Sequence, residues 1–157
     1  MYNTKIHILS KPQFNDFMAN HQINDDNVES KLKSSAVISI NDTAGDWSCS
    51  WFLYDHPNVL RLWFDDVETD LQVSPTNRET CRACTPEQAR RIFEFIKKNK
   101  HRDFLVHCSA GISRSGAIGQ FILDYLGGDK EYFEKYNPHI HPNAHISRLL
   151  NKLAWNE

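Results

Sequence analysis

The chain has 157 residues, of which 40% are hydrophobic, 24% charged and 11% aromatic. This length and composition are typical of one globular domain and exclude a disordered, collagen-like or disulfide-dense protein. Eighteen lysines and arginines nearly balance 20 aspartates and glutamates, for a net charge of -2. The chain therefore lacks the positive field that general binding to nucleic acid or to a membrane surface requires.

The first apolar run ends at Leu9, which is too early for the core of a secretory signal, and no apolar stretch is long enough to cross a bilayer. The four cysteines do not form the pattern of a disulfide framework. They are Cys49, Cys81, Cys84 and Cys108. We therefore expect a cytoplasmic monomer in a reducing environment, without a membrane or nucleic-acid partner.

Three short runs rich in β-branched and other apolar residues predict buried strands. They are Ala36–Ile40, Val59–Phe64 and Phe104–His107. The second run is followed directly by Asp65 and Asp66, and the third by Cys108. Two of the predicted strands therefore end in loops with reactive side chains.

Helices are predicted between and after these strands. Thr85 is placed as an N-cap, with Pro86 at the first helical position and Gln88 to complete a capping box. Further helices are expected from near Ser115, over Lys130–Tyr136, and from about Asn143 to Trp155. The polar stretch Glu68–Cys84 is expected to be the most mobile loop. Alternating strands and helices predict an α/β fold, a single domain over residues 1–157 with a mostly parallel central sheet flanked by helices.

The segment from His107 to Gly116 joins the last predicted strand to a helix, where free backbone N–H groups can bind an anion. Five residues separate Cys108 from Arg114, enough for the loop to form a cup with the sulfur at its base and the guanidinium at its rim. Gly111 permits the turn. Because its planar fork can hold two phosphate oxygens at once, Arg114 favours a phosphoryl ligand.

The same amides, the helix dipole and Arg114 are expected to lower the pKa of Cys108, so that the thiolate is present at neutral pH. Ser115 is placed to donate a hydrogen bond to the sulfur when it becomes a leaving group. We expect His107 to orient the loop rather than to transfer protons. Arg114 and the helix end supply the positive charge, so no metal and no cofactor are expected.

The loop resembles that of the cysteine-dependent protein tyrosine and dual-specificity phosphatases, which reads His-Cys, five residues, Arg, then Ser or Thr. Ser113 stands where the tyrosine-specific branch usually has glycine, and the short chain is more similar to small dual-specificity members. The likeness covers about residues 36–153, and residues 1–35 match no motif. The resemblance implies that the phosphate is bound by the loop between the cysteine and the end of the motif. These residues are Ser109, Ala110, Gly111, Ile112, Ser113 and Arg114.

The resemblance also implies roles for three residues outside the loop. Phe64-Asp65-Asp66 is similar to the Phe-Asp-Asp of the regenerating-liver phosphatases, whose second aspartate is the general acid. Asp66 is therefore the first choice for this role, and Asp65 is its competitor. Asn143, in Pro142-Asn143, resembles an asparagine that supports the cysteine loop, although it also suits the N-cap of the last helix.

These observations predict a phosphatase that hydrolyses phosphotyrosine in proteins, with phosphoserine and phosphothreonine as further candidates, through a phosphocysteine intermediate. Three alternatives stay open: an RNA 5′-triphosphatase, a lipid or inositol phosphatase with the same loop, and a phospho-binding protein without turnover. Cys81 and Cys84 form one Cys-x-x-Cys pair, which is too few ligands for a zinc site but is compatible with a disulfide under oxidation.

Overall fold

Four parallel strands form the centre of the computed structural model, which describes residues 3–72 and 80–157. The strands are β1 (Ile6–Leu9), β2 (Ser35–Asn41), β3 (Val59–Trp63) and β6 (Asp103–His107), and their order in the sheet is β1-β6-β2-β3. The three strands predicted from the sequence are confirmed, as is the α/β class. The first strand was not predicted, and it places part of the unmatched N-terminal segment beside β6.

The sheet is buried on both faces because alternate strand residues enter two separate cores. Val37, Val59 and Leu105 pack with Phe14 and other residues of the first two helices, α1 (Lys11–Asn20) and α2 (Val28–Lys31). Their neighbours on the same strands point to the opposite face and a larger core. Examples are Ile38, Leu60 and Val106.

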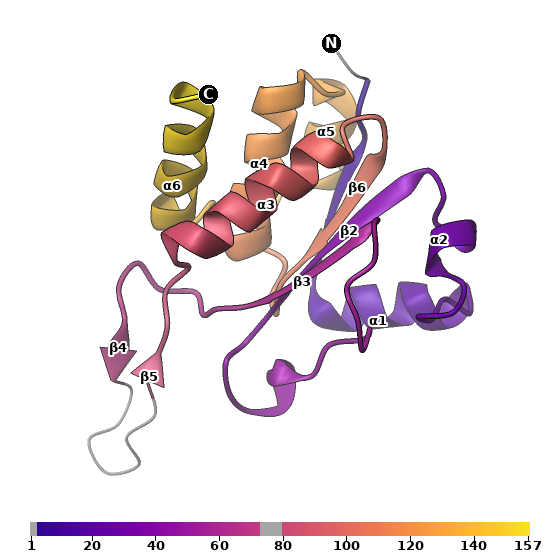
Figure 1. Ribbon diagram of the computed structural model, residues 1–157, viewed down its shortest axis with the longest axis horizontal. Helices are drawn as coiled ribbons and strands as arrows, with labels where there is room; N and C mark the ends of the chain where they lie inside the picture. The colour runs from indigo at the N-terminus through magenta and orange to yellow at the C-terminus, as the bar shows by residue number, and fades with distance from the viewer. Residues whose placement is uncertain (1–2, 73–79) are drawn as a thin grey trace.

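Four helices cover the face with the larger core (Figure 1). They are α3 (Pro86–Lys98), α4 (Arg114–Leu126), α5 (Lys130–Tyr136) and α6 (Ala144–Trp155). The predicted capping box is present at the start of α3, where Thr85 and Gln88 satisfy each other's backbone N–H groups. Within residues 3–72 and 80–157, no helix is long and apolar enough to cross a membrane.

The stretch expected to be the most mobile loop contains a short antiparallel ribbon, in which β4 (Leu71–Gln72) pairs with β5 (Thr80–Cys81). The ribbon projects from the body of the molecule near the start of α3 (Figure 1). Residues 73–79 lie outside the described part of the chain.

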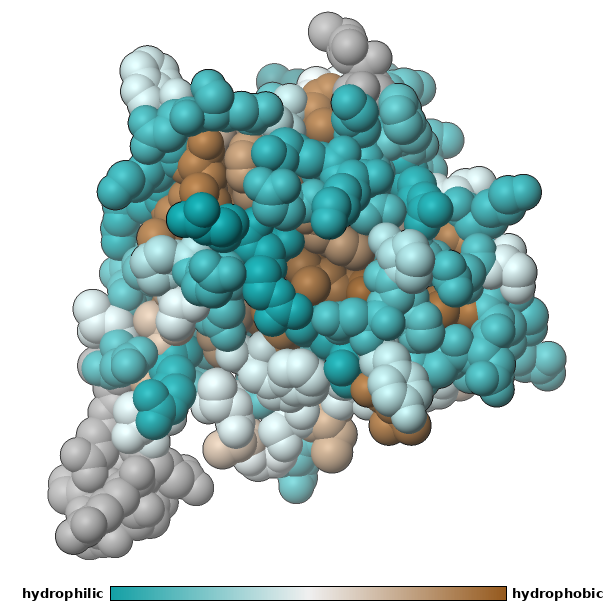
Figure 2. Space-filling model, in the orientation of Figure 1, coloured by the Kyte–Doolittle hydropathy of each residue, from teal (hydrophilic) through white to brown (hydrophobic). Residues whose placement is uncertain are grey.

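The face shown in Figure 2 is mostly hydrophilic, with apolar side chains visible in hollows along α3. One hollow lies between α3 and α6 and includes Phe93 and Leu153. Another lies where α3 meets β3 and includes Leu60 and Phe95. The loops that follow β2, β3 and β6 lie at a different place, at the common carboxyl edge of the parallel strands, where ligand sites of α/β sheets are usually found.

Candidate active site

The loop from Cys108 to Arg114 connects β6 to α4 and is fixed from outside by backbone hydrogen bonds. The carbonyl of Ser109 accepts from the N–H of Lys11 at 3.1 Å, and those of Ile112 and Ser113 accept from His141 and Asn143, both at 3.0 Å. Because the C=O and N–H of one peptide unit point in opposite directions, these bonds turn the following amides toward the inside of the loop. The loop thus has the cup shape expected from the sequence.

Cys108 lies at the base of this cup and is 2% exposed. Its sulfur is 3.1 Å from the Ser115 hydroxyl and accepts a hydrogen bond from the Gly111 N–H at 3.3 Å. Burial alone would raise the pKa of the thiol. Hydrogen bonds from Ser115 and Ile112, together with the charge of Arg114, outweigh burial and lower the pKa of Cys108 below its ordinary value. The cup therefore favours the thiolate, which is the reactive form of cysteine.

Arg114 is the first residue of α4 and is 5% exposed. One terminal nitrogen donates to the carbonyl of Phe64 at 2.8 Å and forms an ion pair with Asp42 at the same distance. The Nε–H is also buried, and it has no hydrogen-bond partner in the part of the chain that the structure describes. A buried donor without a partner costs free energy, which an anion bound in the cup would recover.

Asp42 is the functional residue that the sequence reasoning missed. Its carboxylate pairs with Arg114 and also accepts a 2.8 Å hydrogen bond from the Ser109 hydroxyl, so it holds both ends of the cup. A signal existed in the sequence, because Asp42 follows a predicted strand just as Cys108 does. The carboxyl ends of neighbouring parallel strands meet at one edge of the sheet.

A buried lysine anchors the segment that carries Asp42. Lys11 is 4% exposed, and its ammonium donates to the side chain of Asn41 at 3.1 Å and to the carbonyl of Trp47 at 2.6 Å, as well as to the carbonyl of Cys49. Burial lowers the pKa of Lys11, an effect that the nearby carboxylate of Asp42 opposes. Nothing local in the sequence marks Lys11, because its partners lie at least 30 residues away.

The two aspartates after β3 have different surroundings. Asp65 accepts hydrogen bonds from the Thr43 hydroxyl at 2.5 Å, the Thr43 N–H at 3.0 Å and the Arg82 N–H at 2.8 Å. Burial would raise the pKa of Asp65, but these donors and the charge of Arg114 lower it. Asp65 is therefore held as a carboxylate that fixes the loop, which is unsuitable for a proton donor.

Asp66 is exposed and faces the Cys108 loop. One of its carboxylate oxygens accepts from the Ser113 hydroxyl at 2.7 Å and from the Asn143 side-chain amide at 2.9 Å. The other oxygen accepts no hydrogen bond from any residue in 3–72 or 80–157. The structure thus brings Asp66, rather than Asp65, to the rim of the cup.

Asn143 combines the two roles left open by the sequence. Its side-chain oxygen caps α6 by accepting from the N–H of Ile146 at 3.0 Å, while its side-chain NH2 group donates to Asp66. Its own N–H binds the carbonyl of Ser113. One residue therefore links the start of α6, the Cys108 loop and the loop after β3.

His107 supports the cup from behind. It is 1% exposed, its Nε2 is 2.6 Å from the Ser39 hydroxyl, and its ring stacks on Phe14 with centroids 4.1 Å apart. Burial lowers the pKa of His107 to about 4, against the opposing effect of its contact with the carbonyl of Cys108, and the charges of Lys11 and Arg114 lower it further. A neutral, enclosed imidazole is suited to orienting neighbouring groups, which is the role predicted for His107, rather than to exchanging protons with a ligand.

Several solved structures are similar to this chain. A human tyrosine phosphatase-like serine/threonine/tyrosine-interacting protein is similar at a TM-score of 0.52 with 19% identity, over 94% of this chain and 85% of that chain. A leucine rich repeat and phosphatase domain containing protein from Entamoeba histolytica has a TM-score of 0.48 and 15% identity, over 100% of this chain and 93% of that chain. PTPMT1 in complex with PI(5)P has a TM-score of 0.46 and 14% identity, over 97% and 91%.

No family model matches the sequence, and no curated protein matches it. The likeness to the human protein shows that the chain has the fold of tyrosine phosphatase-like proteins, which is the fold implied by the Cys108 loop.

Proposed function

We propose that this protein is a cysteine-dependent phosphatase that hydrolyses phosphotyrosine in proteins. The observation that carries the proposal is the environment of Cys108. Its sulfur lies at the base of an amide-lined loop, its pKa is lowered, and Arg114 beside it has a buried Nε–H without a partner among the described residues. A pure phosphate-binding protein has no need of an activated thiolate.

The reaction begins when the Cys108 thiolate attacks phosphorus. The new S–P bond forms as the bond between phosphorus and the phenolic oxygen breaks, and Asp66 in its protonated form delivers a proton to that oxygen. Arg114 and the loop amides stabilise the equatorial oxygens. In the second step water attacks the phosphocysteine, Asp66 accepts a proton from it, and the thiolate leaves with a hydrogen bond from Ser115.

Charges beside the cup support a substrate with a single phosphate. Asp42 contacts Ser109 and Asp66 contacts Ser113, so a carboxylate lies on each side of the loop. The nearby cation Lys11 is buried and already bonded to backbone carbonyls. Because Asp66 is protonated when the substrate reacts, the repulsion comes from Asp42. Its carboxylate repels the additional phosphates of an RNA 5′-triphosphate or a polyphosphorylated inositol more strongly than it repels a peptide. We therefore place the phosphoprotein ahead of those alternatives.

The test is phosphate release from matched phosphotyrosine, phosphothreonine and RNA 5′-triphosphate substrates without added metal. We expect turnover of phosphotyrosine that Cys108→Ser abolishes and that Asp66→Asn reduces about 10²–10⁴-fold, the usual contribution of a general acid. The loss is expected to be smaller with p-nitrophenyl phosphate, whose leaving group needs little protonation. Asp65→Asn is the matched control and should affect stability more than leaving-group dependence.

Other outcomes would point to other functions. Turnover of the RNA substrate alone would identify a triphosphatase. Binding of all three ligands without phosphate release by the reduced wild-type protein would contradict an enzyme and indicate a phospho-binding protein.

A further inference from the structure

A cavity of about 380 Å³ lies beside the Cys108 loop, and we call it the side cavity. Residues 110–112 of that loop form part of its wall. Tyr136 and His139, at and after the end of α5, form another part, and Ser10 and Gln13 line it from the start of α1. The phosphate cup and the side cavity therefore share a stretch of chain. The volume is in the range of small-ligand sites.

Two apolar side chains at the side cavity are unusually accessible. Ile112 is 37% exposed and Tyr136 is 47% exposed. They are two of the six large hydrophobic residues that are exposed in the described part of the chain. Exposed aromatic and aliphatic groups that gather at one concave site indicate a surface that binds an apolar group.

The side cavity carries little charge. All of its lining residues lie in the described part of the chain, and none of them is Asp, Glu, Lys or Arg. The two lining histidines are His7 and His139. Burial lowers the pKa of His7, which favours its neutral form near neutral pH. An uncharged occupant therefore loses no ion pair and meets no repulsion here. The side cavity differs in this from the cup, which has the acidic side chains of Asp42 and Asp66 beside it.

The walls of the side cavity are fixed before any ligand arrives. The ring of Tyr136 packs edge-on against His7 with centroids 5.2 Å apart. Asn137 binds the backbone of Ile6 and Ile8, each at 2.8 Å, and so holds the end of α5 against β1. A site that needs no ordering on binding keeps more of the free energy of its contacts.

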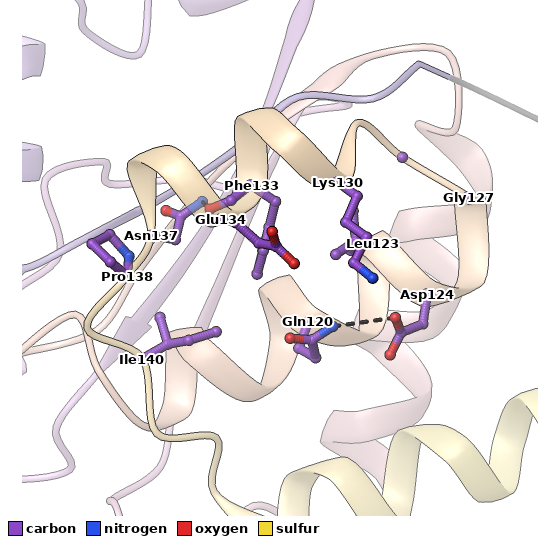
Figure 3. A pocket seen from close by; sticks show the side chains of 11 residues that line it. Gln120, Leu123, Asp124, Gly127, Lys130, Phe133, Glu134, Asn137, Pro138 and Ile140 are labelled. Carbon is purple, nitrogen blue, oxygen red and sulfur yellow. Dashed lines mark hydrogen bonds between the residues drawn. The ribbon is translucent and has the colours of Figure 1, made fainter.

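A second, larger cavity differs from the side cavity in its charge and in its distance from the Cys108 loop. It has a volume of about 740 Å³ and lies between α4 and α5, with Asn137 and Ile140 shared between the two cavities (Figure 3). Its lining includes charged groups on both helices, among them Asp124 and Glu134. It shares no residue with the Cys108 loop, so it has no direct access to the phosphate.

We propose that the side cavity binds the uncharged apolar or aromatic side chain of a residue next to the phosphorylated residue of a peptide substrate, with Ile112 and Tyr136 as its contacts. This inference rests on the proposed phosphatase function. It makes Tyr136 a residue that determines specificity without touching the phosphate.

The test compares three phosphotyrosine peptides that differ only beside the phosphotyrosine. One has glycine on both sides, one has phenylalanine before it and one has phenylalanine after it. We expect kcat/KM to be about tenfold higher for the better phenylalanine peptide than for the glycine peptide, mainly because its KM is lower. A tenfold gain is what partial burial of one aromatic ring supplies. Tyr136→Ala should reduce that ratio to within about twofold, and Tyr136→Phe should retain it. Tyr54→Ala removes a more exposed tyrosine from another loop and should leave the ratio unchanged.

The inference is overturned if neither phenylalanine peptide is preferred by the wild-type protein, or if the preference survives Tyr136→Ala. It is also overturned if a bisphosphorylated inositol headgroup is turned over faster than every peptide. Failure of the proposed phosphatase function is distinguishable, because p-nitrophenyl phosphate would then not be hydrolysed at all.

Discussion

The Ser115 hydroxyl is the residue-scale feature on which the reactivity of Cys108 depends most directly. It lies 3.1 Å from the sulfur and helps to lower the pKa of Cys108 against the effect of burial. A hydrogen bond to a charged group contributes about 1.5–3 kcal/mol, and one pKa unit corresponds to about 1.4 kcal/mol. We therefore expect Ser115→Ala to raise the pKa of Cys108.

The measurement is the rate of alkylation of Cys108 by iodoacetamide as a function of pH, followed by mass spectrometry. In the wild-type protein the rate should remain high as the pH falls below the ordinary thiol pKa. In Ser115→Ala the same profile should move to higher pH, because loss of a donor disfavours the thiolate. Cys84, whose pKa burial raises to about 12, serves as the slow internal reference. Identical profiles in the two proteins would show that Ser115 does not stabilise the thiolate.

The residues of the cup divide into those that a local pattern predicts and those that it does not. Cys108, Arg114 and Ser115 follow from their spacing and from their position between a strand and a helix. Lys11 does not, because its partners are brought near only by the folded sheet. Asp42 is marked only by its position after a predicted strand, and its pairing with Arg114 is visible only in the structure. The different surroundings of the two aspartates after β3 also could not be predicted from the sequence, since their hydrogen-bond donors come from distant parts of the chain.

At the scale of the element, the loop between β6 and α4 depends on the backbone of Gly111. Its φ is +72°, a left-handed conformation, and a Cβ at this position would lie 2.5 Å from the backbone nitrogen of Ser10 and 2.6 Å from the carbonyl carbon of Leu9. Gly45 has a similar φ of +81°, but nothing lies within 4 Å of the corresponding position. The two glycines thus separate the effect of conformation from the effect of crowding.

Gly111→Ala is expected to destabilise the protein by more than about 3 kcal/mol, since it adds a backbone clash to the left-handed strain. Gly45→Ala should cost only about 1 kcal/mol, the strain alone. Urea unfolding followed by circular dichroism measures both. Equal losses in the free energy of unfolding for the two variants would mean that the Cys108 loop and the end of β1 can move apart to accommodate the added methyl group.

Four of the helices were predicted from the sequence, whereas α1 and α2 were not, although α1 also begins with a capping box, formed by Ser10 and Gln13. The capping box at Thr85 and the glycines after Leu126 are local signals, and α3 and α4 begin and end where those signals place them. The strand β1 has only four residues, and β4 and β5 have two each. Such short segments are defined by their pairing with other strands, which periodicity does not reveal.

At the scale of the whole molecule, the N-terminal segment and the helices near the C-terminus are joined through one buried side chain. β1 is an edge strand, and its outer N–H and C=O groups need partners. Asn137 supplies them: its amide donates to the carbonyl of Ile6 and its oxygen accepts from the N–H of Ile8. A side chain therefore takes the place of a further strand. Its two hydrogen bonds join residues that are 129 and 131 positions apart in the sequence.

This connection makes Asn137 a test of whether residues 1–35 belong to the same folding unit as the Cys108 loop. Asn137→Ala leaves two buried backbone groups of β1 without partners, and each such group costs about 1–3 kcal/mol. We expect a loss of about 2–5 kcal/mol in the free energy of unfolding, measured by urea denaturation, with one transition for the whole molecule. Asn151→Ala, at an exposed position of α6, should change it by less than about 0.5 kcal/mol. If Asn137→Ala instead produced a separate early transition for β1 and α1, the N-terminal segment would be an independent unit resting on the domain, because a cooperative single core cannot lose one edge before the rest.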